Sequence, residues 1–222
     1  MWRDAVLIGG KDLRIEMRSR VTTTQVAPYS VMVLLLFGFA FDQDQGLLTK
    51  ASAGLFWVAV LLCCLLAVQR SFSIESVDGA RDGLRLSGVD PAGVFIGKAA
   101  AIAAQLLVLE VLLGIGVAVL FGTDLRDPAL LVSSCLVATA GLAAAGTVYG
   151  MIATGLRVRE TLLPLLILPV VAPVLLAATQ CWMAALGQST VDGWKWMSLL
   201  GAFAVIYLAA GVLSFSVLME EV

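Results

Sequence analysis

The sequence predicts an all-α, polytopic membrane protein with six transmembrane helices. Hydrophobic residues make up 60% of the 222 residues and charged residues 14%, whereas soluble domains have about 45 to 50% and about 25%. Most of the uncharged runs reach the roughly 17 to 25 residues that a spanning helix needs. They lack the alternation of barrel strands, and the bilayer core admits only helices or closed barrels. We therefore expect one transmembrane domain over residues 1–222.

The six spans are expected near residues 21–41, 51–69, 99–121, 129–155, 161–185 and 196–218. The third run is interrupted only by Glu110. The fifth run continues to residue 191 and contains Pro164, Pro169 and Pro173, which kink or break helices. One kinked helix fits this run, and so does a helix followed by a re-entrant or interfacial piece.

The distribution of basic residues predicts the topology, because cytoplasmic loops next to spans collect Lys and Arg. Eleven of the 14 basic residues fall in residues 1–20, 70–98 and 157–159, and three fall in the other loops, at Lys50, Arg126 and Lys195. We expect a multi-pass protein with both termini and residues 70–98 in the cytoplasm. The bacterial cytoplasmic (inner) membrane is the compartment that the family resemblance below implies.

Residues 1–20 carry too many charges for a signal peptide and have the periodicity of an interfacial helix. In such a helix the apolar side chains face lipid and the arginines face the headgroups. Here the apolar residues are Trp2, Val6, Leu13 and Met17, and the arginines are Arg14 and Arg18. Gly9 and Gly10 make a frayed tail the alternative.

The sequence indicates no metal site and no cofactor bound by this chain. It contains no histidine, and its four cysteines fall inside expected spans, where cysteine behaves as a small hydrophobe. Cys63 and Cys64 are adjacent, which is not the Cys-x-x-Cys spacing of zinc or redox sites. No basic tract typical of nucleic-acid binding is present either.

A nucleotide-binding loop is also not expected. Gly93, Gly97 and Lys98 are one residue short of the phosphate-loop spacing, and Ala99 replaces the hydroxyl that holds magnesium. We therefore expect that this chain does not hydrolyse nucleotide itself.

Three residues inside the spans are candidate packing or functional positions. Glu110 lies near the middle of the third span, where a charged acid costs about 2 to 3 kcal/mol. It is either a polar anchor in a transport path or subunit interface, or a protonated carboxyl bonded to a neighbouring helix. Gly146 and Gly150 have the G-x-x-x-G spacing of close helix packing, within this chain or with a second copy.

The charged segment from Arg70 to Lys98 separates the second and third spans. Ile74, Val77, Arg81 and Leu84 share one helical face, which predicts a short amphipathic helix rather than a solvated loop. Asp90 and Pro91 are typical of an N-cap and a first helical residue. A helix from Pro91 to Phe121 would be about 46 Å long, beyond the roughly 30 Å hydrocarbon core, so it should protrude into the cytoplasm.

Five strings along the chain carry a family resemblance: KDLRIEMRSR at 11–20, GLFWVAVLL at 54–62, Arg70-Ser-Phe followed by Asp78-Gly79 and Leu84, Asp90-Pro91 leading to Gly97-Lys98, and ETLLPLLILPVVAP at 160–173. Together they resemble the CcmB family, the membrane subunits of an ABC-type exporter of cytochrome c maturation. The resemblance covers nearly the whole chain. It implies the plan of an ABC-2-type permease, with an N-terminal interfacial helix and a cytoplasmic coupling helix.

The resemblance also implies a homodimeric, non-catalytic permease. Its partners would be a CcmA-type ATPase, a CcmC-type haem-handling protein, a CcmD-type small subunit and the CcmE chaperone, and haem would be held by partner subunits. The permease would couple ATP hydrolysis to haem delivery or to release of haem-loaded CcmE. The coupling residues would lie within residues 70–90: Glu75, Asp78, Gly79, Arg81 and Leu84.

Two other functions fit the same residues. The chain could be an ABC-2-type permease for another cargo, such as a lipid, drug or polysaccharide, or a membrane scaffold whose cytoplasmic segment recruits a partner without transport. Neighbouring cytochrome c maturation genes would favour the haem-related function over another cargo. Purification with and without nucleotide would distinguish a transporter from a scaffold, because a stable partner without an ATPase indicates a scaffold.

Overall fold

The computed structural model describes residues 1–20, 22–40, 45–75, 88–122, 126–154 and 159–221. The described residues are helical apart from short connections and contain no strand, which confirms the all-α prediction. In chain order the elements are α1 (Trp2–Ser19), the π-helical stretch η1 (Thr22–Val26), α2 (Ala27–Ala40), α3 (Gln45–Glu75), α5 (Pro91–Phe121), α6 (Pro128–Thr154), α7 (Arg159–Ala185) and α8 (Gly193–Glu221).

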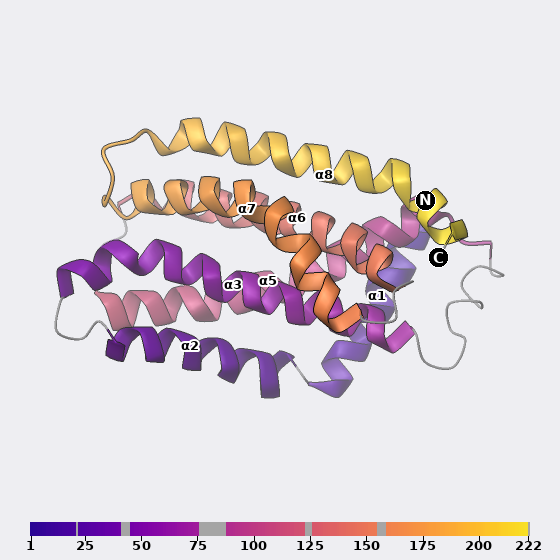
Figure 1. Ribbon diagram of the computed structural model, residues 1–222, viewed down its shortest axis with the longest axis horizontal. Coiled ribbons are helices and arrows are strands. Elements are labelled where there is room, and N and C mark those ends of the chain that lie inside the picture. The colour runs from indigo at the N-terminus through magenta and orange to yellow at the C-terminus, as the bar shows by residue number, and fades with distance from the viewer. Residues whose placement is uncertain (21, 41–44, 76–87, 123–125, 155–158, 222) are drawn as a thin grey trace.

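The longer helices run side by side along the longest axis of the molecule, and α1 crosses one end of them (Figure 1). Five helices, α3 and α5 to α8, are long and apolar enough to cross a membrane, and a sixth span results if α1 and α2 are counted as one bent pair. The protein is therefore a multi-pass membrane protein. The two termini lie at the same end of the bundle (Figure 1).

The helix that follows α1 begins irregularly. Residues 22–26 form a π-helical stretch, and α2 itself has only 14 residues. Pro28 explains the irregularity, because it has no N–H to donate to the carbonyl four residues earlier. α1 itself ends at its C-cap, Arg20, which has a left-handed backbone with a φ of 53°, and the direction changes by 55° between α1 and the helix that follows it.

α5 begins and ends where its sequence predicts. Asp90 is its N-cap and accepts a hydrogen bond from the Ala92 amide at 3.3 Å, and Pro91 is its first residue. Its 31 residues give a length of about 46 Å. α3 also has 31 residues and extends well beyond the predicted span at both ends.

The run from 161 to 191 was compatible with one kinked helix or with a helix followed by a re-entrant or interfacial piece, and the structure has one kinked helix, α7. It is one helix that contains Pro164, Pro169 and Pro173, and it visibly changes direction along its length (Figure 1), as internal prolines predict. It ends in a Schellman-type turn, in which the Gln188 amide donates to the Met183 carbonyl at 2.8 Å and Gly187 has a φ of 68°. No re-entrant segment follows among residues 186–192, which connect directly to α8.

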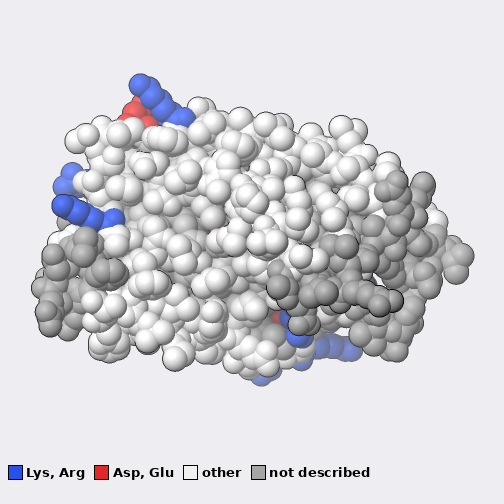
Figure 2. All heavy atoms as spheres, in the orientation of Figure 1, with Lys and Arg blue, Asp and Glu red and all other residues white. Residues whose placement is uncertain are grey.

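The core lies around the small residues of α6, which contacts α3, α5, α7 and α8. Outside the core, apolar side chains are exposed, for example Val205 and Leu213 of α8. Figure 2 shows a broad face almost without charge, with basic side chains gathered only near the ends of the bundle. This is the surface that a lipid environment favours.

Candidate functional site: a buried charge clamp at one end of the bundle

The predicted coupling segment connects the end of α3 to the start of α5. Asp78, Gly79, Arg81 and Leu84 lie outside the described residues, and Glu75 is the last residue of α3, with its side chain also outside them. The structure therefore describes what holds the two flanks of this segment. Both flanks are bound to α1 by a group of polar residues that we call the charge clamp: Asp12, Glu16, Arg70, Ser71 and Lys98.

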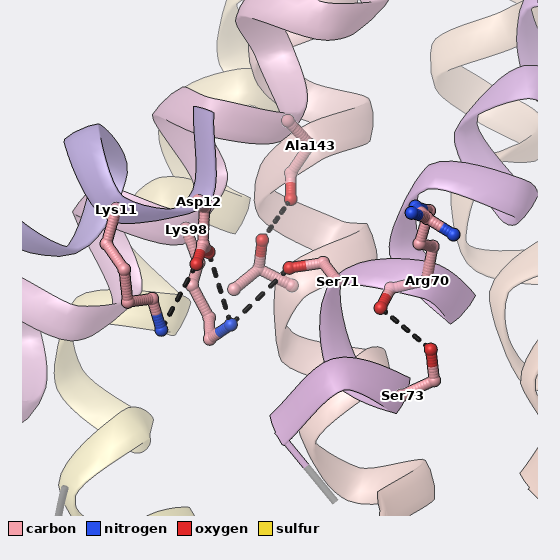
Figure 3. A network of polar contacts seen from close by, with 8 residues as sticks. Lys11, Asp12, Arg70, Ser71, Ser73, Lys98 and Ala143 are labelled. Atoms are coloured by element: carbon pink, nitrogen blue, oxygen red, sulfur yellow. Dashed lines mark hydrogen bonds and ion pairs between the residues drawn. The ribbon is translucent and has the colours of Figure 1, made fainter. Parts of the chain in front are cut away.

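Lys98 of α5 is the centre of the charge clamp. Its side chain is only 1% exposed, and its Nζ lies 3.4 Å from Asp12 Oδ2 of α1 and 3.4 Å from Ser71 Oγ of α3 (Figure 3). The ammonium group also lies 4.7 Å from the centroid of the Phe72 ring, within the range of a cation–π contact. One buried cation thus joins three helices.

A second ion pair strengthens the connection between α1 and α3. Arg70 Nε lies 3.1 Å from Glu16 Oε2, with side chains 30% and 11% exposed. Asp12 has a further partner in Lys11, whose Nζ lies 3.2 Å from its Oδ1. Asp12 and Glu16 are four residues apart, so both carboxylates lie on the face of α1 that is turned toward the bundle.

Small residues allow α1 to approach α5 closely. A Cβ atom added to Gly93 would lie 2.8 Å from the Met1 carbonyl oxygen, and one added to Gly97 would lie 2.6 Å from the Ala5 carbonyl oxygen. On α1, a Cβ atom at Gly9 would lie 3.0 Å from the Gly97 carbonyl oxygen. Gly93 and Gly97 have the G-x-x-x-G spacing, and they serve helix packing here.

The chemistry of the charge clamp is that of attachment. Burial of Lys98 is costly unless its charge is compensated, and Asp12 compensates it. Buried ion pairs contribute little net stability but strongly disfavour arrangements in which a partner is lost. The clamp therefore fixes the position of α1 relative to both flanks of residues 76–87. No group of three or more possible metal ligands occurs in the described part of the chain.

Glu110 lies on α5 twelve residues beyond Lys98, or about 18 Å along the helix axis. It is buried, and its Oε1 accepts a hydrogen bond from the Thr139 hydroxyl of α6. Among the described residues its Oε2 has no hydrogen-bond partner. An interhelical hydrogen bond was common to both sequence interpretations of Glu110, and the structure contains it.

Gly146 and Gly150 of α6 face α3 of the same chain. An added Cβ atom would lie 2.7 Å from Val68 Cγ2 at Gly146 and 2.5 Å from Phe72 Cε2 at Gly150. The ring of Phe72 that contacts Lys98 thus also packs against Gly150. The α3–α6 packing and the charge clamp share this aromatic side chain.

A groove of about 680 Å³ opens next to the charge clamp. Its lining comes from the η1–α2 region, α3 and α7. Its polar residues are Gln25 and Tyr29 in the first of these and Gln69, Arg70 and Ser73 toward the end of α3. The apolar part of the lining includes Leu62, Leu65, Leu66 and Pro164.

Sequence reasoning missed the charge clamp. Asp12 and Glu16 were interpreted as charges that exclude a signal peptide and as part of the string at 11–20. Lys98 was counted as a cytoplasmic basic residue, was part of another such string and was compared with a phosphate loop. No contact between these residues was expected. The available signal was the combination of a lysine seven residues into a long apolar helix with two glycines spaced for close packing. A buried lysine next to such an interface needs a carboxylate from whichever helix packs there.

The comparisons with known proteins agree with this architecture. The family model described as CcmB protein matches residues 4–219. Proteins named heme exporter protein B are similar over most of their length: that of Haemophilus influenzae is 29% identical over 88% of this chain and 87% of its own. Those of Paracoccus denitrificans and Rhodobacter capsulatus are each 31% identical, over 75% of this chain and 76% of their own. With a family match across almost its entire length, the chain belongs to the CcmB family of membrane proteins.

Proposed function

We propose that this protein is the permease subunit of an ABC transporter of cytochrome c maturation. In this function a CcmA-type ATPase binds and hydrolyses ATP with Mg²⁺, and the permease couples hydrolysis to haem delivery or to release of haem-loaded CcmE. The relatives named heme exporter protein B support the haem part of the proposal. CcmC-type and CcmD-type subunits and a second copy of this chain complete the expected assembly.

The observation that carries the coupling role is the charge clamp. A segment that receives force from a motor must be attached to the spans, or the motion is lost in local bending. Lys98 and Arg70 attach both flanks of residues 76–87 to α1. The flanks belong to helices of 31 residues each, so a displacement at their ends is carried into the membrane.

The position of Gly93, Gly97 and Lys98 supports the assignment of ATP hydrolysis to another subunit. The two glycines pack against α1, and Lys98 Nζ is engaged by Asp12 and Ser71. These residues therefore hold helices together in this fold. We propose that a partner subunit binds and hydrolyses the nucleotide. The coupling segment would lie in the cytoplasm next to that subunit, and the protein would lie in the inner membrane.

The test replaces Asp78, because we propose that the two acidic residues of the coupling segment, Glu75 and Asp78, face basic groups of the ATPase. We expect Asp78→Lys to leave membrane insertion intact and to lower mature cytochrome c on the order of tenfold, because a like charge replaces an attractive pair at the interface. Mature cytochrome c is measured by covalent haem staining, and ATPase binding by co-purification. Asp44→Lys is the matched control, with the same charge change on the side predicted to face away from the ATPase.

Two results would contradict the proposal. If Asp78→Lys leaves both cytochrome c yield and ATPase binding unchanged, the coupling segment is wrongly assigned. If deletion of the whole chain leaves cytochrome c unchanged, the transporter carries another cargo. Mass spectrometry of proteins that co-purify with the chain, with and without nucleotide, separates a transporter from a scaffold that has no ATPase partner.

A further inference from the structure

The charges of α1 are sorted between its two faces. Its three acidic residues all have cationic partners: Asp4 is paired with the Met1 amine at 3.4 Å, Asp12 with Lys98, and Glu16 with Arg70. The side chains of Asp12 and Glu16 are only 10% and 11% exposed. Arg70 of α3 and Lys98 of α5 therefore neutralise Glu16 and Asp12 from within the bundle.

The opposite face of α1 presents cations and apolar side chains. Arg14 and Arg18 are exposed and have no ion pair with any residue in the described ranges. Val6, Leu7 and Met17 are also exposed, by 73%, 61% and 76%. Together with Lys11 these residues line a shallow hollow of about 770 Å³ on the helix surface.

This combination of residues fits one occupant. A soluble protein seldom exposes large apolar side chains next to unpaired arginines, whereas a helix at the membrane surface does so with apolar groups below the headgroups and cations among them. α1 crosses the end of the bundle rather than running parallel to the spans (Figure 1). Figure 2 shows basic side chains along the edge of the molecule near this end.

We propose that the outer face of α1 is a binding site for anionic phospholipid, with the phosphate held by Arg14 and Arg18 and the acyl region by Val6, Leu7 and Met17. Internal neutralisation of Asp12 and Glu16 makes the site selective for anionic over zwitterionic headgroups, because no unpaired carboxylate repels the phosphate. The cytoplasmic leaflet, where this end of the protein is predicted to lie, carries such lipids.

The test measures lipid binding to the full-length chain. Purified protein in detergent is titrated with phosphatidylglycerol or with phosphatidylcholine of the same acyl chains, and bound lipids are counted by native mass spectrometry. We expect phosphatidylglycerol to bind more tightly at the first site. Each cation near an anionic membrane surface raises the affinity about fivefold. Arg14→Gln combined with Arg18→Gln should therefore reduce the preference for phosphatidylglycerol over phosphatidylcholine roughly 30-fold.

The matched control combines Lys50→Gln with Lys195→Gln. Both lysines are exposed, and they lie at the opposite end of the spans; this double variant removes the same charge and should retain the preference. A second measurement needs no variant: raising the salt concentration from 0.1 to 1 M shortens the Debye length from about 10 to about 3 Å and should abolish most of the preference of the unaltered chain.

Equal binding of the two lipids to the unaltered chain would overturn the proposal, and the α1 face would then be assigned to a protein partner. An equal loss of preference in both double variants would also overturn it, because the effect would follow net charge and not this site. All four substituted residues are exposed, so we expect unchanged thermal unfolding of both variants.

Discussion

Removal of Asp12 and of Lys98 should have unequal effects on stability, although the two residues form one ion pair. Lys98 is 1% exposed, and Asp12 is 10% exposed with a second partner, Lys11, at 3.2 Å. Asp12→Ala therefore removes the carboxylate that α1 supplies to a buried ammonium group. Lys98→Met leaves a carboxylate that keeps Lys11 and some contact with water.

The magnitudes follow from this asymmetry. Removing one partner of a buried pair costs about 3 to 5 kcal/mol, and the partial exposure of Asp12 places Asp12→Ala at the lower end, about 3 kcal/mol. Lys98→Met should cost about 1 kcal/mol, because the remaining charge resembles a partly exposed pair and the methionine side chain keeps the contact with the Phe72 ring. The double variant should cost about 2 kcal/mol, which gives a coupling energy of about 2 kcal/mol.

The free energy of unfolding is measured by titrating the purified chain with sodium dodecyl sulfate in mixed micelles, and the docking of α1 by hydrogen exchange of its amides. Arg14→Met is the control, since it removes an exposed cation of α1 that has no ion pair among the described residues; it should change the free energy by less than about 0.5 kcal/mol. Equal losses for Asp12→Ala and Lys98→Met, or additive losses in the double variant, would refute the assigned role of the buried ion pair.

The other packing predictions use the same unfolding assay. Gly97→Ala should cost about 1 to 3 kcal/mol through overpacking against α1, while Gly114→Ala, in the same helix with nothing within 4 Å of the added atom, should be neutral or stabilise by up to about 1 kcal/mol; equal effects would contradict the close contact. Gly150→Ala should cost about 1 to 3 kcal/mol and also increase hydrogen exchange in α1, because it displaces the Phe72 ring that contacts Lys98. Unchanged exchange would show that the α3–α6 packing and the charge clamp are independent of each other. Thr139→Val should cost about 1 to 3 kcal/mol by removing a donor from a buried carboxyl, whereas Glu110→Gln should stay within about 1 kcal/mol because its amide oxygen can still accept; the reverse order would refute the hydrogen bond.

Features set by local sequence were predictable. The apolar runs gave the helices, since a chain in lipid must satisfy its backbone groups within each segment. The start of α5 followed from Asp90 and Pro91, because a side-chain acceptor followed by a residue with no N–H suits a first helical turn. The same residues determined that α5 is longer than the bilayer is thick.

Features that depend on contacts distant in sequence were not predictable. Asp12 and Lys98 are 86 residues apart, and no periodicity indicates that α1 crosses α5. Gly93 and Gly97 were compared with a nucleotide loop because the pattern of residue types is similar, although their use here depends on the helix that packs against them. Pro28 was overlooked for a different reason: it lies inside an apolar run, where composition dominates any interpretation.

Rigidity differs among the helices, and this has a consequence for the proposed transport cycle. α3 and α5 run without an internal proline from the flanks of residues 76–87 through the bundle, and the charge clamp joins α1 to both. α7 contains three prolines, which weaken the helix where they remove hydrogen bonds. A displacement imposed on residues 76–87 should therefore move α1, α3 and α5 as one body, while α7 changes its angle to them.

This consequence can be measured with spin labels on exposed positions of the chain in complex with the proposed ATPase partner. Met17 of α1, Val108 of α5 and Leu165 of α7 are 76%, 69% and 68% exposed, so cysteines placed there can be labelled while the native cysteines are mostly buried. On addition of nucleotide, the distance between positions 17 and 108 should stay constant and that between 17 and 165 should change. If the first distance changes as much as the second, the charge clamp opens during the cycle, and Lys98 exchanges its partners instead of holding α1 in place.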